Sequence, residues 1–264
     1  MLEAKCHETN AFVTLTYDKE HLPADGSLDP IELRNFLYRL RQSVKPNRFR
    51  FFAVGEYGDE SFRPHYHLLL FNFPVCRKGV SDFRRNSCCP VCDLVHRVWS
   101  RGIVKVGAVT DESAAYCTGY VSKKMTRKED PRLDGKHPEF SRMSTRPGLG
   151  ALALDDVASK LLELDLHKTL PDVPSALRIG SKVMPLGRYL RRKLRERIGR
   201  SPNAPQSTLD EMEEQLRLVR EAAIIDTPRV GQKNAFKGAL VTRSLQKRRS
   251  LEAKSKIFKT RKSL

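Results

Sequence analysis

The sequence lacks the features that would place it in several broad classes of protein. No stretch approaches the roughly 18 consecutive apolar residues of a membrane span, so we expect no membrane partner. The N-terminus carries no basic segment followed by an apolar one, which argues against a signal peptide. The sequence also shows no internal repeat.

Three enzyme signatures are also missing. The chain has no G-x-x-x-x-G-K-[ST] loop, so we expect no ATPase in it, and it has no H-E-x-x-H metalloprotease helix. His65 and His67 are not followed by a third histidine at position 69, which argues against the histidine-triad nucleotide hydrolases. We expect no small-molecule cofactor.

Acidic residues are scarce relative to basic ones. The 264 residues include 31 Asp and Glu against 49 Lys and Arg, which gives a formal net charge of +18. Residues 182–264 alone hold 22 basic and 8 acidic residues, a net charge of +14. Because Lys and Arg release counterions when they neutralise phosphates, this excess favours a nucleic-acid partner. We interpret the last third as an electrostatic arm on an otherwise ordinary domain.

Six cysteines without a signal peptide indicate a reducing cytoplasm, where thiols stay free or bind metal. Cys89 and Cys92 form a C-x-x-C motif. Cys76 or Cys88, together with His96, could complete a tetrahedral structural Zn²⁺ site with them. The alternative is a set of free thiols in a cytosolic loop.

The order of predicted elements indicates an α+β fold. Residues 12–17, 49–54, 65–71 and 103–109 are typical of strands, and helices are expected over 31–44, over 94–99 and after Thr110. Asp29 and Pro30 are a strong helix start. The order β-α-β-β-α-β-α predicts a ferredoxin-like, RRM-like antiparallel sheet with helices on one face.

The division into regions follows composition. We predict one domain over residues 1–126, with a zinc-binding insertion at 76–96, and a linker and irregular extension over 127–181. Leucines four residues apart among arginines and lysines predict a basic helical region over 182–226. Residues 227–264 are expected to be a flexible basic tail.

His65 and His67 form the most informative motif. Side chains two residues apart share one face of a strand, so both imidazoles could bind one metal. Glu56 follows the preceding strand and could join them. Two histidines and a carboxylate suit Mn²⁺ or Mg²⁺ on a phosphate oxygen. The alternatives are histidines that merely alternate on a half-exposed strand and a glutamate in a turn.

Tyr116 and Tyr120 are four residues apart on the predicted third helix, so they share one helix face. A phenolate is a competent nucleophile toward phosphate, and Lys123 or Lys124 could lower the pKa of the phenol. The alternative is an amphipathic helix whose tyrosines pack on the sheet. Gly119 costs roughly 1 kcal/mol in a helix interior, which hints that another group approaches closely there.

Taken together, these motifs resemble the three-motif layout of the HUH endonucleases that initiate rolling-circle replication. The wording is similar to that of the replication initiators of gokushoviruses, single-stranded DNA phages of the Microviridae. The resemblance covers about residues 2–150, and the matching stretches are 12–18, 52–58, 63–71, 112–124 and 140–150.

The resemblance implies a set of residue roles. His65, His67 and Glu56 would bind Mg²⁺ or Mn²⁺, and Tyr120 would be the leading nucleophile with Lys123 as its partner. Tyr116 would be the second tyrosine. Such enzymes nick one strand at an origin and leave a 5′-phosphotyrosyl link and a free 3′-OH. A second transfer then closes the circle.

The resemblance also implies partners. These would be single-stranded or replicative-form phage DNA at the origin and, in the host bacterial cytoplasm, a host helicase and polymerase. Relatives carry a longer, cysteine-containing N-terminal region, so an in-frame extension upstream is a further expectation. The DNA-binding candidates are Arg63, Lys124, Arg191, Arg192, Lys193 and Arg195.

Two other interpretations remain open. A non-catalytic nucleic-acid-binding protein with a ferredoxin-like sheet would display strand aromatics for base stacking, here Phe51, Phe52 and Tyr66. A protein that packages DNA through its basic arm would account for the C-terminal third alone.

Overall fold

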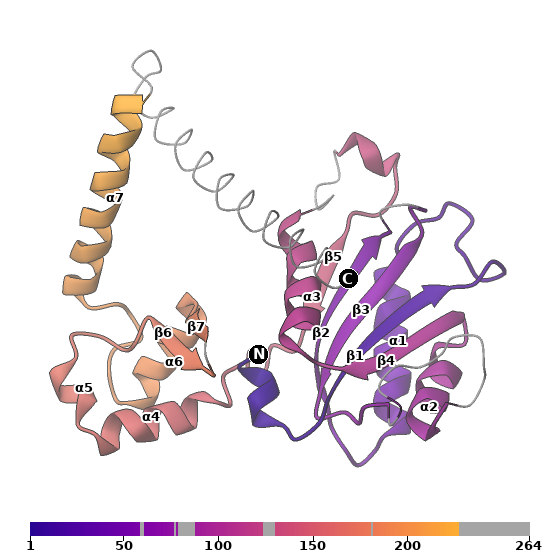
Figure 1. The fold of residues 1–264 in the computed structure, drawn as a ribbon, viewed down its shortest axis with the longest axis horizontal. Coiled ribbons are helices and arrows are strands. Elements are labelled where there is room, and N and C mark those ends of the chain that lie inside the picture. Colours follow the sequence, from indigo (N-terminus) through magenta and orange to yellow (C-terminus); the bar gives the residue numbers. More distant parts are fainter. Residues whose placement is uncertain (59–60, 77, 79–87, 124–129, 181, 227–264) are drawn as a thin grey trace, which may run out of the picture.

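The computed structural model describes residues 1–58, 61–76, 78, 88–123, 130–180 and 182–226 (Figure 1). At its centre is a five-stranded antiparallel sheet with the strand order β4-β1-β3-β2-β5. Its strands are β1 (Asn10–Tyr17), β2 (Arg50–Tyr57), β3 (Pro64–Phe71), β4 (Gly102–Ala108) and β5 (Phe140–Met143).

Helices α1 (Pro30–Ser43) and α2 (Pro90–Trp99) make the two connections that define the topology. Helix α1 joins β1 to β2, and α2 joins β3 to β4. With β3 inserted between β1 and β2, this is the split βαβ arrangement. The predicted α+β, ferredoxin-like fold is confirmed.

The alternation of side chains along β1 explains how the sheet has two different faces. Ala11, Val13 and Leu15 are buried in the larger core, which α1 and α2 cover. Phe12 and Thr14 point to the opposite face. At the start of α1, the carboxylate of Asp29 accepts the backbone N–H of Ile31 and so acts as the expected N-cap.

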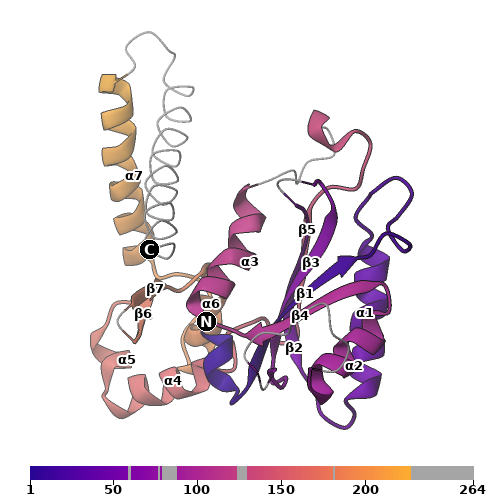
Figure 2. The same ribbon diagram turned by 45° about the vertical axis from the view of Figure 1, so that its right-hand side comes forward.

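Helix α3 (Asp111–Lys123) corrects the prediction that the helices share one face. Figure 1 and Figure 2 both show α3 on the side of the sheet away from α1 and α2. The physical reason is that β2 and β3 are apolar on both faces, so the second face also needs cover. Ala114 and Cys117 of α3 pack there, against Phe52, Val54, Leu69 and Phe71.

Residues 127–181 are more ordered than a linker and irregular extension. After a short 3₁₀ helix, η2 (Pro131–Leu133), strand β5 pairs with β2 in a register that sets Gly55 opposite Phe140. The sheet therefore extends past residue 126. Helices α4 (Leu154–Glu163) and α5 (Leu166–Thr169) and strand β6 (Ala176–Ile179) follow.

A second, smaller core lies beside the sheet (Figure 1). It involves α4, the hairpin of β6 and β7 (Lys182–Pro185), and α6 (Arg188–Arg197). Its buried residues are Leu154, Ala158, Leu161, Val173, Leu186 and Leu194. Helix α7 (Gln206–Asp226) projects from this unit, and the predicted tail at 227–264 lies outside the described residues.

Glu3 ties the two units together. It lies in the N-terminal 3₁₀ helix η1 (Glu3–Cys6) and is 3% exposed. Its carboxylate accepts hydrogen bonds from the Arg50 guanidinium of β2 and from the backbone N–H of Gly150, which precedes α4. No described helix combines the length and the hydropathy that a membrane crossing requires.

Candidate active site

A pocket of about 630 Å³ opens on the face of the sheet that α3 partly covers. It lies where α3 leaves the strands uncovered, toward the ends of β1 and β2 and the start of β3. Its lining combines side chains from four strands and from α3. These residues are Phe12, Thr14, Thr16, Glu56, Gly58, His65, His67, Ile103, Lys105 and Tyr116.

His67 is held on both sides of its ring. Its Nε2 lies 2.8 Å from the Oε1 of Glu56, and its Nδ1 lies 3.0 Å from the hydroxyl of Thr14. His67 and Glu56 are 5% and 3% exposed, so this contact is buried. A hydroxyl can donate to or accept from Nδ1, so Thr14 can orient the ring in either tautomer.

His65 lies on the same face and parallel to His67. The two ring planes differ by 7°, and the ring centroids are 6.4 Å apart. The Nδ1 of His65 lies 2.6 Å from the carbonyl oxygen of Arg63. Since a carbonyl only accepts, Nδ1 carries the proton and Nε2 keeps a lone pair for a ligand. Burial lowers the pKa of His65, which favours the neutral, ligating imidazole.

The donor set of this pocket fits a divalent cation. Two imidazoles and one carboxylate, with space beside them, suit Mn²⁺ or Mg²⁺ better than the all-sulfur sets that soft metals prefer. The register of the sheet explains the proximity, because Glu56 of β2 is paired directly with His65 of β3. Glu56 therefore lies inside a strand, not after it as predicted.

Tyr116 is the described tyrosine that faces this site. Its ring meets His67 edge-on at 5.1 Å and Phe12 at 6.4 Å, and 47% of the residue is exposed. By contrast, Tyr17 and Tyr66 are buried on the opposite face and hydrogen-bond to each other. Burial raises the pKa of Tyr17 to about 12 and that of Tyr66 further, which makes both poor nucleophiles.

The remaining described tyrosines are not in the pocket. Tyr57 is buried and donates to the carbonyl of His137, Tyr38 lies on α1, and the hydroxyl of Tyr189 accepts the N–H of Gly148. Tyr120 and Lys123 belong to α3, but their side chains lie outside the described residues, as does all of Lys124.

The backbone of α3 nevertheless indicates where Tyr120 lies along the sheet. The helix begins beside the start of β1, since Val109 donates to the carbonyl of Asn10. It runs past His67 at Tyr116. Four residues add about 6 Å of helix. The backbone at Tyr120 is therefore about one turn farther toward the end of β3 that carries His65.

Sequence reasoning missed Thr14 and Lys105 as individual site residues. Thr14 stands between the inward-facing Val13 and Leu15, and Lys105 stands between the buried Val104 and Val106. Both therefore point to the α3 face, and they are paired across β1 and β4. The alternation itself was the available signal. What the sequence could not supply was the neighbourhood of β4, β1 and β3.

Gly119 does not mark a close approach by any described group. A Cβ placed on it would have no described atom within 4 Å. The close approach is at Gly58 instead, where an added Cβ would lie 3.2 Å from the His65 ring and crowd the pocket.

The predicted DNA-binding arginines separate into two groups. Arg195 is 5% exposed, and its guanidinium makes two hydrogen bonds to the carboxylate of Asp172, so its assignment to a DNA-binding surface is wrong. Burial alone would raise the pKa of Asp172, but bonds and charges from Arg195 and Arg191 outweigh it and lower the pKa to about 2. Arg191 also contacts this buried carboxylate.

Other basic candidates keep an exposed side. Arg192 and Lys193 pair with Glu196 on the surface of α6, where they remain accessible. Arg63 lies beside the pocket and donates to the carbonyl of Tyr17. Contact of these residues with DNA stays a prediction.

Comparisons with known proteins agree with the motifs. Residues 10–125 match the family model described as replication-associated protein ORF2. The chain is 35% identical over 144 residues to replication-associated protein VP4 of Bdellovibrio phage phiMH2K, which is 52% of this chain and 45% of that protein. It is 33% identical over 167 residues to replication-associated protein ORF4 of Chlamydia phage 1, covering 58% and 40% of the two chains.

A third relative is replication-associated protein ORF2 of Spiroplasma virus 4. The identity is 31% over 155 residues, which cover 53% of this chain and 46% of that protein. The chain thus spans less than half the length of the curated relatives it matches. No solved structure matches it.

The resemblance to phage replication proteins is therefore confirmed. The matched segment begins with β1 and includes every residue of the pocket lining. Residues 10–125 carry the domain described as replication-associated protein ORF2.

Proposed function

We propose that this chain is a metal-dependent HUH endonuclease that nicks one DNA strand at a specific origin and initiates rolling-circle replication. The printed names of the relatives support a role in phage replication. The observation that carries the nicking activity is the position of His67, which contacts Glu56 on one side and meets Tyr116 on the other.

The proposed reaction is a transesterification at phosphorus. A tyrosine oxygen of α3 forms a bond to the phosphorus as the bond from phosphorus to the 3′ oxygen breaks. The phenol loses its proton to solvent, and the departing 3′ oxygen gains one to become a 3′-OH. The energy of the phosphodiester is kept in the 5′-phosphotyrosyl bond, so a second transfer can rejoin the strand.

The residues of the pocket have separate parts in this proposal. His65, His67 and Glu56 would hold Mg²⁺ or Mn²⁺, which would supply Lewis-acid polarisation of the phosphate. Thr14 orients the ring of His67. Lys105 brings a cation to the pocket wall, where it can offset charge on the phosphate. Tyr120 and Tyr116 are proposed as the two nucleophiles, with Lys123 beside Tyr120.

The test uses a single-stranded oligonucleotide that contains the phage origin, incubated with the full chain and Mn²⁺. We expect a covalent protein–DNA adduct on a denaturing gel and its loss when EDTA is added. Tyr120→Phe and Tyr116→Phe should each reduce the adduct, and the double variant should abolish it. Tyr38→Phe, on the far face of the sheet, is the matched control and should react like the unaltered chain.

An adduct that persists in the double variant would contradict this proposal. So would a failure of any origin-spanning fragment of the phage genome to react while DNA binding remains intact.

The structure disfavours the non-catalytic alternative. Phe51, Phe52 and Tyr66 would have to be exposed to stack on bases, but they are 9%, 7% and 0% exposed. Phe51 and Tyr66 belong to the core under α1 and α2, and Phe52 packs under α3.

A further inference from the structure

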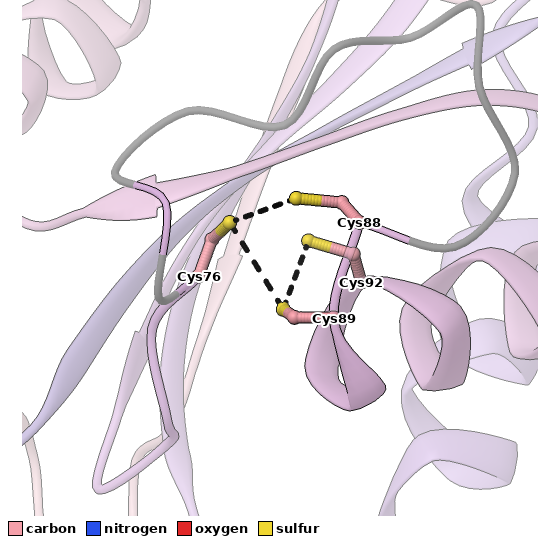
Figure 3. A group of neighbouring side chains, drawn as sticks. All are labelled: Cys76, Cys88, Cys89 and Cys92. Carbon is pink, nitrogen blue, oxygen red and sulfur yellow. Dashed lines mark hydrogen bonds between the residues drawn. The ribbon is translucent and has the colours of Figure 1, made fainter.

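Four cysteines converge at one place that the proposed reaction does not use. Cys76 follows β3, Cys88 and Cys89 precede α2, and Cys92 lies in its first turn. Their sulfur atoms all lie within 4.8 Å of one another, as Figure 3 illustrates. Within the described part of the chain, no other group of three or more potential metal ligands is this compact.

The spacing of the sulfurs fits a single tetrahedral ion. The Cys76 sulfur lies 3.5 Å from that of Cys88 and 4.0 Å from that of Cys89, and Cys89 lies 3.6 Å from Cys92. A zinc ion with bonds of about 2.3 Å to sulfur would place its ligands about 3.8 Å apart. All four cysteines are free thiols, so no disulfide competes for them.

The start of α2 favours thiolates at this position. Cys89 is the N-cap residue, yet its side chain makes no capping hydrogen bond, and Figure 3 shows it turned toward the other cysteines. Cys92 is three residues farther, in the first turn. The partial positive charge of a helix N-terminus stabilises anionic sulfur there.

The location indicates a structural role for the bound ion. Cys76 and Cys92 are buried in the core that α1 and α2 share, on the face of the sheet opposite to the His65–His67 pocket. Four protein ligands also leave no open position for a substrate. His96 is exposed on α2 and does not belong to the cluster, so the predicted histidine ligand is replaced by a fourth cysteine.

We propose that Cys76, Cys88, Cys89 and Cys92 bind one structural Zn²⁺, which fastens the end of β3 to the start of α2. The same strand carries His65 and His67, so the ion would stabilise the element that supports the pocket without entering the reaction. This proposal does not depend on the nicking activity.

The first test is elemental analysis of the full chain, expressed and purified without chelator. We expect zinc close to one per chain. Cys89→Ser and Cys92→Ser should each reduce the zinc content to near zero and lower the unfolding midpoint. Cys6→Ser is the matched control, since Cys6 lies in η1 outside the cluster, and it should keep its zinc.

A second measurement avoids variants that fail to fold. Unaltered protein produced in Co²⁺ medium should show the visible absorption of tetrahedral cobalt–thiolate sites, and added Zn²⁺ should displace it. Sub-stoichiometric zinc with no cobalt–thiolate absorption would overturn the proposal. Equal zinc loss in Cys6→Ser and Cys89→Ser, or stoichiometric iron in place of zinc, would overturn it as well.

Discussion

His67 connects three residues of different chemistry, and each contact limits what the ring can do. Thr14 contacts Nδ1, Glu56 contacts Nε2, and Tyr116 meets the edge of the ring. Because Nε2 is the nitrogen nearest the carboxylate, a cation shared with Glu56 would bind there. Thr14 would then accept the proton of Nδ1 and fix the tautomer.

Substitution of these contacts should therefore give graded losses. We expect His67→Ala to abolish adduct formation and leave DNA affinity almost unchanged, since the basic residues of the chain are intact. Thr14→Val keeps the side-chain shape but removes the hydroxyl, and it should lower the cleavage rate about 10- to 100-fold. Gel-based cleavage rates and fluorescence anisotropy measure the two properties separately.

The controls for these two variants are an exposed histidine and an exposed threonine. His21→Ala removes an imidazole that pairs with Asp18 outside the pocket, and Thr169→Val changes α5 in the second core unit. Both should cleave normally. A normal rate in Thr14→Val would show that the ring of His67 needs no such partner.

The residue scale is also where sequence alone went furthest. The spacing of His65 and His67 on a strand predicted that they share a face, and their rings are parallel. Glu56 was expected nearby, but its direct pairing with His65 depends on the β2–β3 register. The role of Lys105 could not be predicted, because it depends on a strand from a distant part of the chain.

At the scale of elements, the edge strand β5 and helix α3 are the parts that the sequence described least well. The four residues Phe140–Met143 show no clear alternation and follow Pro138, so a strand there depends on pairing with β2. The ring of Phe140 lies over Gly55, the position before Glu56. A Cβ on Gly55 would come within 2.7 Å of this ring.

Two glycine substitutions test this packing in opposite directions. Gly55→Ala should destabilise the fold by about 1–3 kcal/mol, because Phe140 and Leu28 must move. Gly119→Ala, inside α3 with no described atom within 4 Å of the new Cβ, should stabilise by up to about 1 kcal/mol. Urea denaturation measures both, and a stabilised Gly55→Ala variant would contradict the described register.

At the scale of the whole molecule, chemistry and charge are separated along the chain. The pocket belongs to the sheet, whereas most of the excess positive charge follows residue 181. The sequence predicted this separation from charge counts alone. It did not predict the second core or the Glu3 contacts that join it to the sheet, since both depend on tertiary contacts between distant segments.

The basic tail should contribute affinity without sequence preference. Residues 229–264 hold 12 basic residues and 1 acidic residue. Deletion of this segment should weaken binding at low salt and flatten the dependence of log K on log salt, because fewer counterions are released. A variant with the same length and glutamine at the basic positions should behave like the deletion. An unchanged slope in both would exclude this contribution.

The chemical identity of the protein–DNA link is the most direct test of the central claim. The covalent adduct should be digested with nuclease and trypsin, and the peptides should be sequenced by mass spectrometry. We predict a nucleotide attached through a 5′-phosphate to Tyr116 or Tyr120 in the peptide of residues 106–123. A nucleotide on a residue elsewhere in the chain, or an adduct without a phosphotyrosine bond, would contradict the account.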